Sequence, residues 1–183
     1  MTRTAIEEGQ LGGRSLQRVV FTADQVRTRV RELSRDISIA YGAEDRLLLI
    51  GLLKGSFIFL ADLVREITIP LQVDFLVAAS YGAGKTTSGD VRLLYDPASS
   101  LDGRAVVVVE DIIDSGKTLR KILPRLEARA PASLEVCALL HKRLSPADLD
   151  PRWVGFDAPN EFLVGYGLDH AEDFRHLPYI ASL

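Results

Sequence analysis

The stretch AVVVVEDIIDSGKTL, residues 105–119, decides the fold class of this chain. Residues 105–109 are all apolar and mostly β-branched, which predicts a strand buried on both faces, as in a parallel sheet. Carboxylates, a glycine and a helix-favouring segment follow directly, so the stretch predicts a strand, an acidic loop and a helix. Parallel α/β sheets carry their chemistry at the carboxyl ends of their strands. We therefore expect a functional site directly after Val109.

Two kinds of group meet in this acidic loop. The turn Ser115, Gly116, Lys117 and Thr118 precedes a helix predicted over 119–130, and free backbone N–H groups at a helix start bind phosphate. Carboxylates repel phosphate, so the acids must face hydroxyl groups, a divalent cation or an acidic proton. A phosphorylated sugar bound with magnesium presents all three. The acids in question are Glu110, Asp111 and Asp114.

A plainer interpretation is that Asp114 or Ser115 only caps the helix, while Glu110 and Asp111 are solvated loop residues. Three acids that close a fully apolar strand argue against it.

Composition indicates one domain of ordinary globular character. The 183 residues are 47% hydrophobic and 26% charged, and their longest apolar run is shorter than a bilayer span. We expect residues 1–14 to form a loose tail and residues 15–183 a single domain. The start of the chain lacks the apolar segment of a secretory signal, which predicts a cytoplasmic protein. The net charge of −3 is interspersed along the chain and favours neither nucleic acid nor membrane partners.

The strand, turn and helix pattern occurs a second time, at residues 47–67. The apolar run LLLIGLL (47–53) predicts a buried strand, and Lys54, Gly55 and Ser56 separate it from a helix over 57–67. A lysine beside free N–H groups at a helix start suits a pyrophosphate group. Upstream, a capping box of Thr22 and Gln25 begins a helix that continues to residue 41.

A long hairpin and a further buried strand complete the predicted sheet. Strands at 73–80 and 91–95 enclose SYGAGKTTSGD (80–90), which we interpret as a mobile lid rather than a Walker A loop, because position 79 is not glycine. Residues 134–140 predict another buried strand, which ends at the basic run His141, Lys142 and Arg143. Residues 151–183 contain many aromatic residues and little helical pattern, which suggests a small hood over the sheet edge.

Residues 107–118, VVVEDIIDSGKT, resemble the phosphoribosyl-pyrophosphate motif of type I phosphoribosyltransferases, in the form typical of hypoxanthine-guanine phosphoribosyltransferases. LLKGS (52–56) resembles the family's pyrophosphate loop, with a cis bond between Leu53 and Lys54. Ser80 and Tyr81 resemble the pair that closes over the active site, and FLVGYGLD (162–169) resembles the base-binding segment. The resemblance extends over roughly three quarters of the chain.

The resemblance implies the type I phosphoribosyltransferase fold, a parallel twisted α/β sheet flanked by helices with a small hood and a hairpin lid. It implies transfer of phosphoribose from 5-phosphoribosyl 1-pyrophosphate to a 6-oxopurine, hypoxanthine and also guanine, giving IMP or GMP and pyrophosphate. It further implies Mg²⁺ as cofactor and assembly into a homodimer or homotetramer. The family's preference among hypoxanthine, guanine and xanthine is not fixed by these motifs.

The resemblance also assigns a role to each candidate residue. Residues 114–118 would hold the 5′-phosphate, with Asp114 as the general acid/base at the purine imidazole nitrogen. Glu110 and Asp111 would hold the ribose hydroxyls directly or through magnesium, and Asp169 would help to anchor the metal. The pyrophosphate ligands would be Lys54, Gly55 and Arg175. The base ligands would be Lys142 at the 6-oxo group, Phe162 by stacking, and the backbone near Leu163 at the exocyclic edge.

Two alternatives use the same fold. An RNA-binding attenuation regulator would need a basic surface and a uracil-sized pocket, and the net charge of −3, Lys142 and the 162–169 segment speak against it. A non-catalytic nucleotide-binding domain would be expected to lose Asp114, which this chain has.

Overall fold

The computed structural model describes residues 16–80, 91–143 and 149–183. Its main element is a six-stranded sheet with the strand order β4-β3-β2-β5-β6-β7. All neighbouring pairs are parallel except β3 and β4, which form an antiparallel hairpin. The strands are β2 (Leu48–Leu53), β3 (Gln72–Ser80), β4 (Val91–Tyr95), β5 (Ala105–Ile113), β6 (Ser133–His141) and β7 (Trp153–Asp157). The predicted parallel α/β sheet is therefore confirmed.

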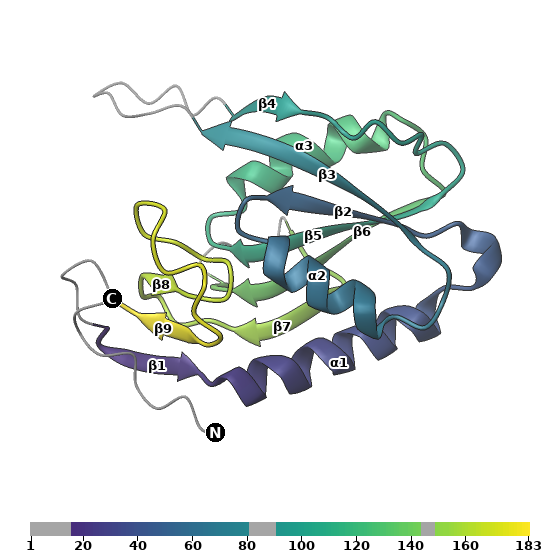
Figure 1. The fold of residues 1–183 in the computed structure, drawn as a ribbon. Coiled ribbons are helices and arrows are strands. Elements are labelled where there is room, and N and C mark those ends of the chain that lie inside the picture. The colour runs from purple at the N-terminus through teal and green to yellow at the C-terminus, as the bar shows by residue number, and fades with distance from the viewer. Residues whose placement is uncertain (1–15, 81–90, 144–148) are drawn as a thin grey trace.

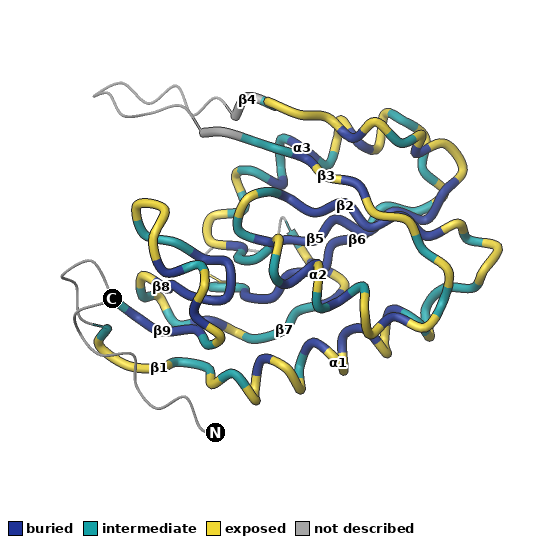
Figure 2. Tube along the Cα trace, viewed as in Figure 1, coloured by how far each residue is buried: buried dark blue, intermediate teal, exposed yellow. Residues whose placement is uncertain are grey.

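Helices cover both faces of this sheet. Successive side chains of a strand point to opposite faces, and Leu49 and Val107 pack in one cluster with α1 (Ala23–Ala40) and α2 (Phe57–Glu66). Their neighbours Leu48 and Val106 pack instead in a second cluster with α3 (Lys117–Glu127). The central strands are thus buried on both sides, as Figure 2 shows along β2, β5 and β6. A short 3₁₀ turn, η2 (Ala43–Asp45), precedes β2.

The helix α1 begins where the sequence predicts. The Thr22 hydroxyl accepts a hydrogen bond from the Gln25 backbone N–H at 3.3 Å, and the Gln25 side chain accepts one from the Thr22 N–H at 2.8 Å. This reciprocal pair is a complete capping box, which satisfies two of the unpaired donors at the helix start.

A second sheet of three antiparallel strands lies beside the edge to which the parallel strands of the main sheet point (Figure 1). Its order is β1-β9-β8, formed by β1 (Arg18–Phe21), β9 (Ile180–Ser182) and β8 (Leu163–Val164). The range 151–183, predicted to form a hood, therefore includes β7, which belongs to the main sheet. Conversely, β1 pairs with the C-terminal strand although it comes from the other end of the chain.

Two element boundaries differ from the sequence prediction. The strand expected to end at Val109 continues to Ile113, because Glu110, Ile112 and Ile113 pair with residues of β6. Glu110 and Asp111 therefore belong to the strand and not to a loop. The helix α3 begins at Lys117 instead of residue 119 and ends at Glu127 instead of residue 130.

Two predicted segments fall wholly or mainly outside the described residues. These are the N-terminal tail, 1–14, and the lid, in which Ser80 is the last residue of β3 and Tyr81 lies beyond the described part. No helix in the described ranges is both long enough and apolar enough to span a membrane.

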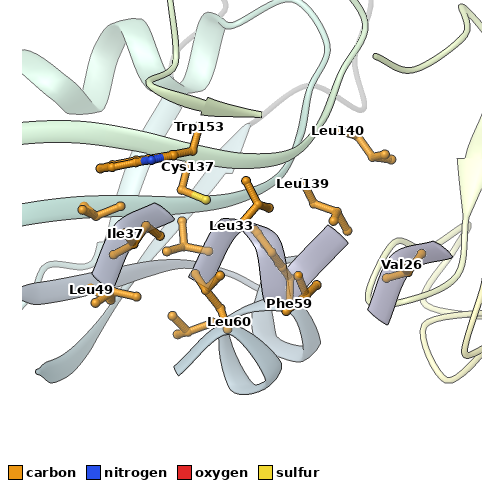
Figure 3. Close-up of a cluster of buried hydrophobic side chains, with 14 of the residues drawn as sticks. Val26, Leu33, Ile37, Leu49, Phe59, Leu60, Cys137, Leu139, Leu140 and Trp153 are labelled. Carbon is orange, nitrogen blue, oxygen red and sulfur yellow. The ribbon is translucent and has the colours of Figure 1, made fainter. Parts of the chain in front are cut away.

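Leu33 offers a direct test of the core packing. It is fully buried on α1 in the same cluster as Phe59 and Leu139 (Figure 3), whereas Ile39 on the same helix is 72% exposed. Leu33→Ala should lower the free energy of unfolding by about 2–5 kcal/mol, because it removes buried surface and leaves a cavity. Ile39→Ala should change it by less than about 0.5 kcal/mol. Urea unfolding of both variants measures this, and equal effects would contradict the described packing.

Candidate functional site

The carboxyl ends of β2, β5 and β6 bring three segments of the chain together. Residues 54–56 follow β2, residues 110–118 contain the end of β5 and the start of α3, and residues 141–143 contain the end of β6. All the strands involved are parallel, so these segments share one edge of the sheet. The segment after β8 lies at the same edge, because Gly167 packs against Gly55.

Two glycines allow close backbone approach at this edge. A Cβ atom added at Gly55 would lie 1.7 Å from the Oδ2 atom of Asp111, so residue 55 packs directly on that carboxylate. A Cβ atom added at Gly167 would lie 2.1 Å from the carbonyl oxygen of Gly55, and Gly167 has a φ of +102°. The peptide bond between Leu53 and Lys54 is cis, as the resemblance implies. The ends of β2 and β5 and the segment after β8 are therefore in contact.

Four charged side chains form what we call the ionic cluster: Lys54, Asp169, Glu172 and Arg175. Lys54 Nζ lies 3.0 Å from Glu172 Oε2, and Arg175 Nη2 lies 3.3 Å from the same oxygen. Arg175 Nη2 is also 2.8 Å from Asp169 Oδ1, and its Nη1 donates to the Gly167 carbonyl at 2.7 Å. The structure thus brings together the predicted pyrophosphate ligands Lys54 and Arg175, with Asp169 beside them.

The two acids near the end of β5 lie in an environment that disfavours their charge. Burial raises the pKa of Glu110 well above its ordinary value, and the charge of Asp111 adds to this effect. Burial also raises the pKa of Asp111 to about 6, although hydrogen bonds from the backbone and the charge of Arg175 partly oppose it. The Oε2 atom of Glu110 is buried and has no hydrogen-bond partner within the described residues.

These carboxylates fit a magnesium ion that completes its coordination with other ligands. In residues 16–80, 91–143 and 149–183, no group of three or more His, Cys, Asp or Glu side chains is arranged to hold a metal. Mg²⁺ is usually bound by one or two carboxylates together with water and substrate phosphates. Asp111 and Asp169 are near enough for the charge of Asp169 to raise the pKa of Asp111, and both are hard oxygen donors.

A second charged pair joins the ends of β5 and β6. Lys142 Nζ lies 3.0 Å from Asp114 Oδ2, and the Lys142 backbone N–H donates to the Ile113 carbonyl at 3.0 Å. The Lys142 side chain is only 10% exposed, whereas that of Asp114 is 56% exposed. A largely buried lysine side chain thus lies beside a carboxylate that solvent or a ligand can reach.

Among the described residues, no side chain caps the start of α3. Its N-cap is Gly116, at φ +68°. The plainer interpretation of Asp114 or Ser115 as a helix cap is therefore wrong. The first N–H groups of a helix have no partner within it and attract anions. A Cβ atom added at Gly116 would lie 2.5 Å from Leu149 Cδ1, so glycine also suits the packing here.

Phe162 presents an accessible ring at the start of the segment predicted to bind a base. The residue is 54% exposed, and its ring centroid lies 5.2 Å from that of His170 in an edge-to-face contact of 67°. Its neighbour Leu163 is buried in β8. Phe162 is therefore held by β8 and His170 while its ring remains available for stacking.

Sequence reasoning missed three participants in this arrangement: Gly167, His170 and Glu172. No sequence pattern singles out His170, and only the structure places its ring against Phe162. Glu172 lies three positions from both Asp169 and Arg175, and this spacing is the sequence feature that could have indicated a contact among them. Gly167 was part of the FLVGYGLD motif, but its contact with Gly55 joins segments far apart in the chain.

Comparison with known proteins gives one family. The phosphoribosyl transferase domain family matches residues 22–171. A hypoxanthine phosphoribosyltransferase of Salmonella typhimurium is 44% identical over 167 residues, which cover 90% of this chain and 94% of that protein. A hypoxanthine-guanine phosphoribosyltransferase of Mycobacterium avium is 44% identical over 186 residues, which cover 98% of this chain and 92% of that protein.

Solved structures agree with the sequence relatives. The crystal structure of a hypoxanthine-guanine phosphoribosyltransferase from Bacillus anthracis superposes with a TM-score of 0.86 at 40% identity. The superposition covers 92% of this chain and 99% of that one.

The raised pKa of Asp111 predicts a pH-dependent effect of Asp111→Asn. The folded chain keeps the proton up to a pH of about 6, whereas an unfolded aspartate loses it near 3.8. The stability that this proton contributes is complete below about pH 4 and is lost as the pH rises through about 6. The variant should therefore gain stability relative to the wild type between about pH 4 and pH 7.

Urea unfolding of both chains across this pH range measures the effect. Asp102→Asn, at an exposed residue in the loop before β5, controls for the loss of one carboxylate. A difference between Asp111→Asn and wild type that is constant with pH would contradict the burial described for Asp111.

Proposed function

This chain belongs to the phosphoribosyl transferase domain family, and from that premise we propose that it is a purine-salvage enzyme. The reaction is transfer of phosphoribose from 5-phosphoribosyl 1-pyrophosphate to hypoxanthine and also guanine, which yields IMP or GMP and pyrophosphate. The relatives of similar length and more than 40% identity carry the names of enzymes of this kind.

The structural observation that best supports this proposal is the contact between Lys142 and Asp114. It places a fixed ammonium donor and an accessible carboxylate 3.0 Å apart beside the free N–H groups of α3. A 6-oxopurine needs both groups, since its oxygen accepts a hydrogen bond and its imidazole nitrogen must lose or gain a proton. Adenine has an amino donor where these purines have the oxygen, so Lys142 disfavours it.

The phosphoribosyl donor is proposed to bind across the two charged regions of the site. The 5′-phosphate lies against the backbone of residues 114–118, where free donors meet the positive end of α3. The pyrophosphate group lies between Lys54 and Arg175, with the close backbone of Gly55 beside it. The ribose hydroxyls face Glu110 and Asp111 at the end of β5.

Catalysis then rests on charge and proton placement. The ribosyl carbon becomes cation-like as the pyrophosphate leaves, so the barrier falls when the negative charge on the leaving group is stabilised. Lys54 and Arg175 provide that stabilisation, and Asp114 exchanges the proton of the purine imidazole. The ring of Phe162 stacks on the base, the backbone near Leu163 meets its exocyclic edge, and both hold the base in line with the ribose.

Magnesium is proposed as the cofactor, held by Asp169 together with Glu110 and Asp111. When bound, it neutralises the charge of the pyrophosphate and orients that group. The pKa values of Glu110 and Asp111 are raised, as expected for carboxylates whose charge a bound cation would neutralise.

The RNA-binding alternative receives no support from the relatives described above, which are named as transferases. Four further expectations stay predictions. They are assembly into a homodimer or homotetramer, a cytoplasmic location, closure of a lid at Ser80 and Tyr81, and the division into a tail and one domain.

The experiment that tests the function measures nucleotide formation from 5-phosphoribosyl 1-pyrophosphate with Mg²⁺. Hypoxanthine, guanine, xanthine, adenine and uracil are supplied in parallel. We expect products from hypoxanthine and guanine and none from adenine or uracil, because of the Lys142 donor. Product from uracil alone, or from no base, would overturn the proposal.

Asp114→Asn tests the acid/base assignment. The amide keeps an oxygen for Lys142 Nζ but cannot exchange the proton, so kcat should fall by about 10²–10⁴-fold with the fold intact. Asp102→Asn, an exposed residue at the opposite end of β5, should leave kcat unchanged. Steady-state kinetics and thermal unfolding of both variants measure this. Unchanged turnover in Asp114→Asn would remove Asp114 from the mechanism.

A further inference from the structure

The carboxylate of Glu172 lies where two cations meet. Lys54 Nζ and Arg175 Nη2 approach the same oxygen, Oε2, at 3.0 and 3.3 Å. These two residues come from segments far apart in the chain, and no other acid in the described part pairs with Lys54. Glu172 is therefore the internal counter-ion that joins the cations assigned to the leaving pyrophosphate.

The backbone holds Glu172 in this position. Its N–H donates to Asp169 Oδ2 at 2.9 Å, and a bridge between His170 and Asp173 closes the turn. Glu172 itself has a φ of +70°, a left-handed conformation that is unfavourable for a residue with a side chain. A turn fixed in this way directs the side chain back toward Lys54 and Arg175.

A bound anion can replace the contacts of Glu172 with Lys54 and Arg175, whereas the contacts of Arg175 with Asp169 and the Gly167 carbonyl would remain. The side chains of Lys54 and Glu172 are 65% and 64% exposed, and ion pairs as exposed as this contribute little stability. The Arg175 side chain is only 18% exposed and is also fixed by Asp169 and the Gly167 carbonyl. A doubly charged anion that reached these cations would displace Glu172 and leave Arg175 in place.

We propose that Glu172 is a placeholder for the pyrophosphate group, which holds Lys54 and Arg175 in position when the site is empty and competes with pyrophosphate for them. This inference rests on the proposed function. After displacement the carboxylate stays near the bound anion and repels it, so Glu172 weakens the binding of pyrophosphate both as product and as part of the substrate. The pKa of Glu172 is lowered, first by the hydrogen bond from Lys54 and then by that from Arg175, in keeping with its place between the cations.

The test compares Glu172→Gln with the wild type in binding inorganic pyrophosphate with Mg²⁺, measured by titration calorimetry. Glutamine keeps the shape and removes the charge, so pyrophosphate should bind roughly three- to tenfold more tightly. The KM for 5-phosphoribosyl 1-pyrophosphate should fall by a similar factor while kcat does not rise, because the lost repulsion affects substrate and transition state alike.

Asp173→Asn is the matched control. It removes one negative charge from the neighbouring exposed residue, and its affinity for pyrophosphate should equal that of the wild type. Thermal unfolding of both variants shows whether the turn is intact.

Equal or weaker pyrophosphate binding by Glu172→Gln, in a wild type that makes nucleotide, would overturn the placeholder role alone. Tightening of the same size in Asp173→Asn would also overturn it, because the effect would then be one of net charge. A wild type that neither binds pyrophosphate nor makes nucleotide would overturn the proposed function, and the placeholder role with it.

Discussion

The close backbone approach of residues 55, 111 and 167 is the constraint on which the rest of the site depends. Because neither glycine carries a side chain, the segment after β2 rests on the Asp111 carboxylate, and the segment after β8 rests on the Gly55 carbonyl. Lys54 and Arg175 belong to these segments, so backbone packing places the bases of the two cationic side chains near each other, and the Glu172 carboxylate joins their charged ends. Such a frame would suit the proposed binding of pyrophosphate, a small and highly charged group.

Two buried acids of this chain differ in how their charge is compensated. Burial alone would raise the pKa of Asp74, but hydrogen bonds from Ser99 and Phe75 lower it overall, and both backbone N–H groups lie 2.8 Å from its oxygens. Glu110 has no such donor at Oε2 within the described residues, and its pKa is raised. An uncompensated buried carboxylate costs stability unless a bound ligand or ion supplies the missing partner.

The sequence predicted the main sheet well because its signals are local. The apolar run at 47–53, the strand and turn after residue 105, and the capping box at Thr22 each lie within a few residues, and the structure contains all of them. It predicted the end of β5 wrongly, because acidic residues there are held in the strand by pairing with β6. The pairing of β1 with β9, the contact of Gly167 with Gly55 and the position of Glu172 depend on segments distant in the chain, which no local pattern reveals. The roles assigned to individual residues came from the resemblance and not from periodicity.

The pairing of β1 with β9 also has a consequence for how the molecule assembles. The βαβ units of the main sheet join neighbouring parts of the chain and can form early, whereas β1 must wait for residues 180–182 to be synthesised. Closing so long a loop is entropically costly and gains stability only when its strands finally pair. The second sheet can therefore be complete only after residues 180–182 have been synthesised, and β8, which leads into the segment bearing Asp169 and Arg175, also needs β9 as its partner. A nascent chain can thus have an ordered core well before it has a working site.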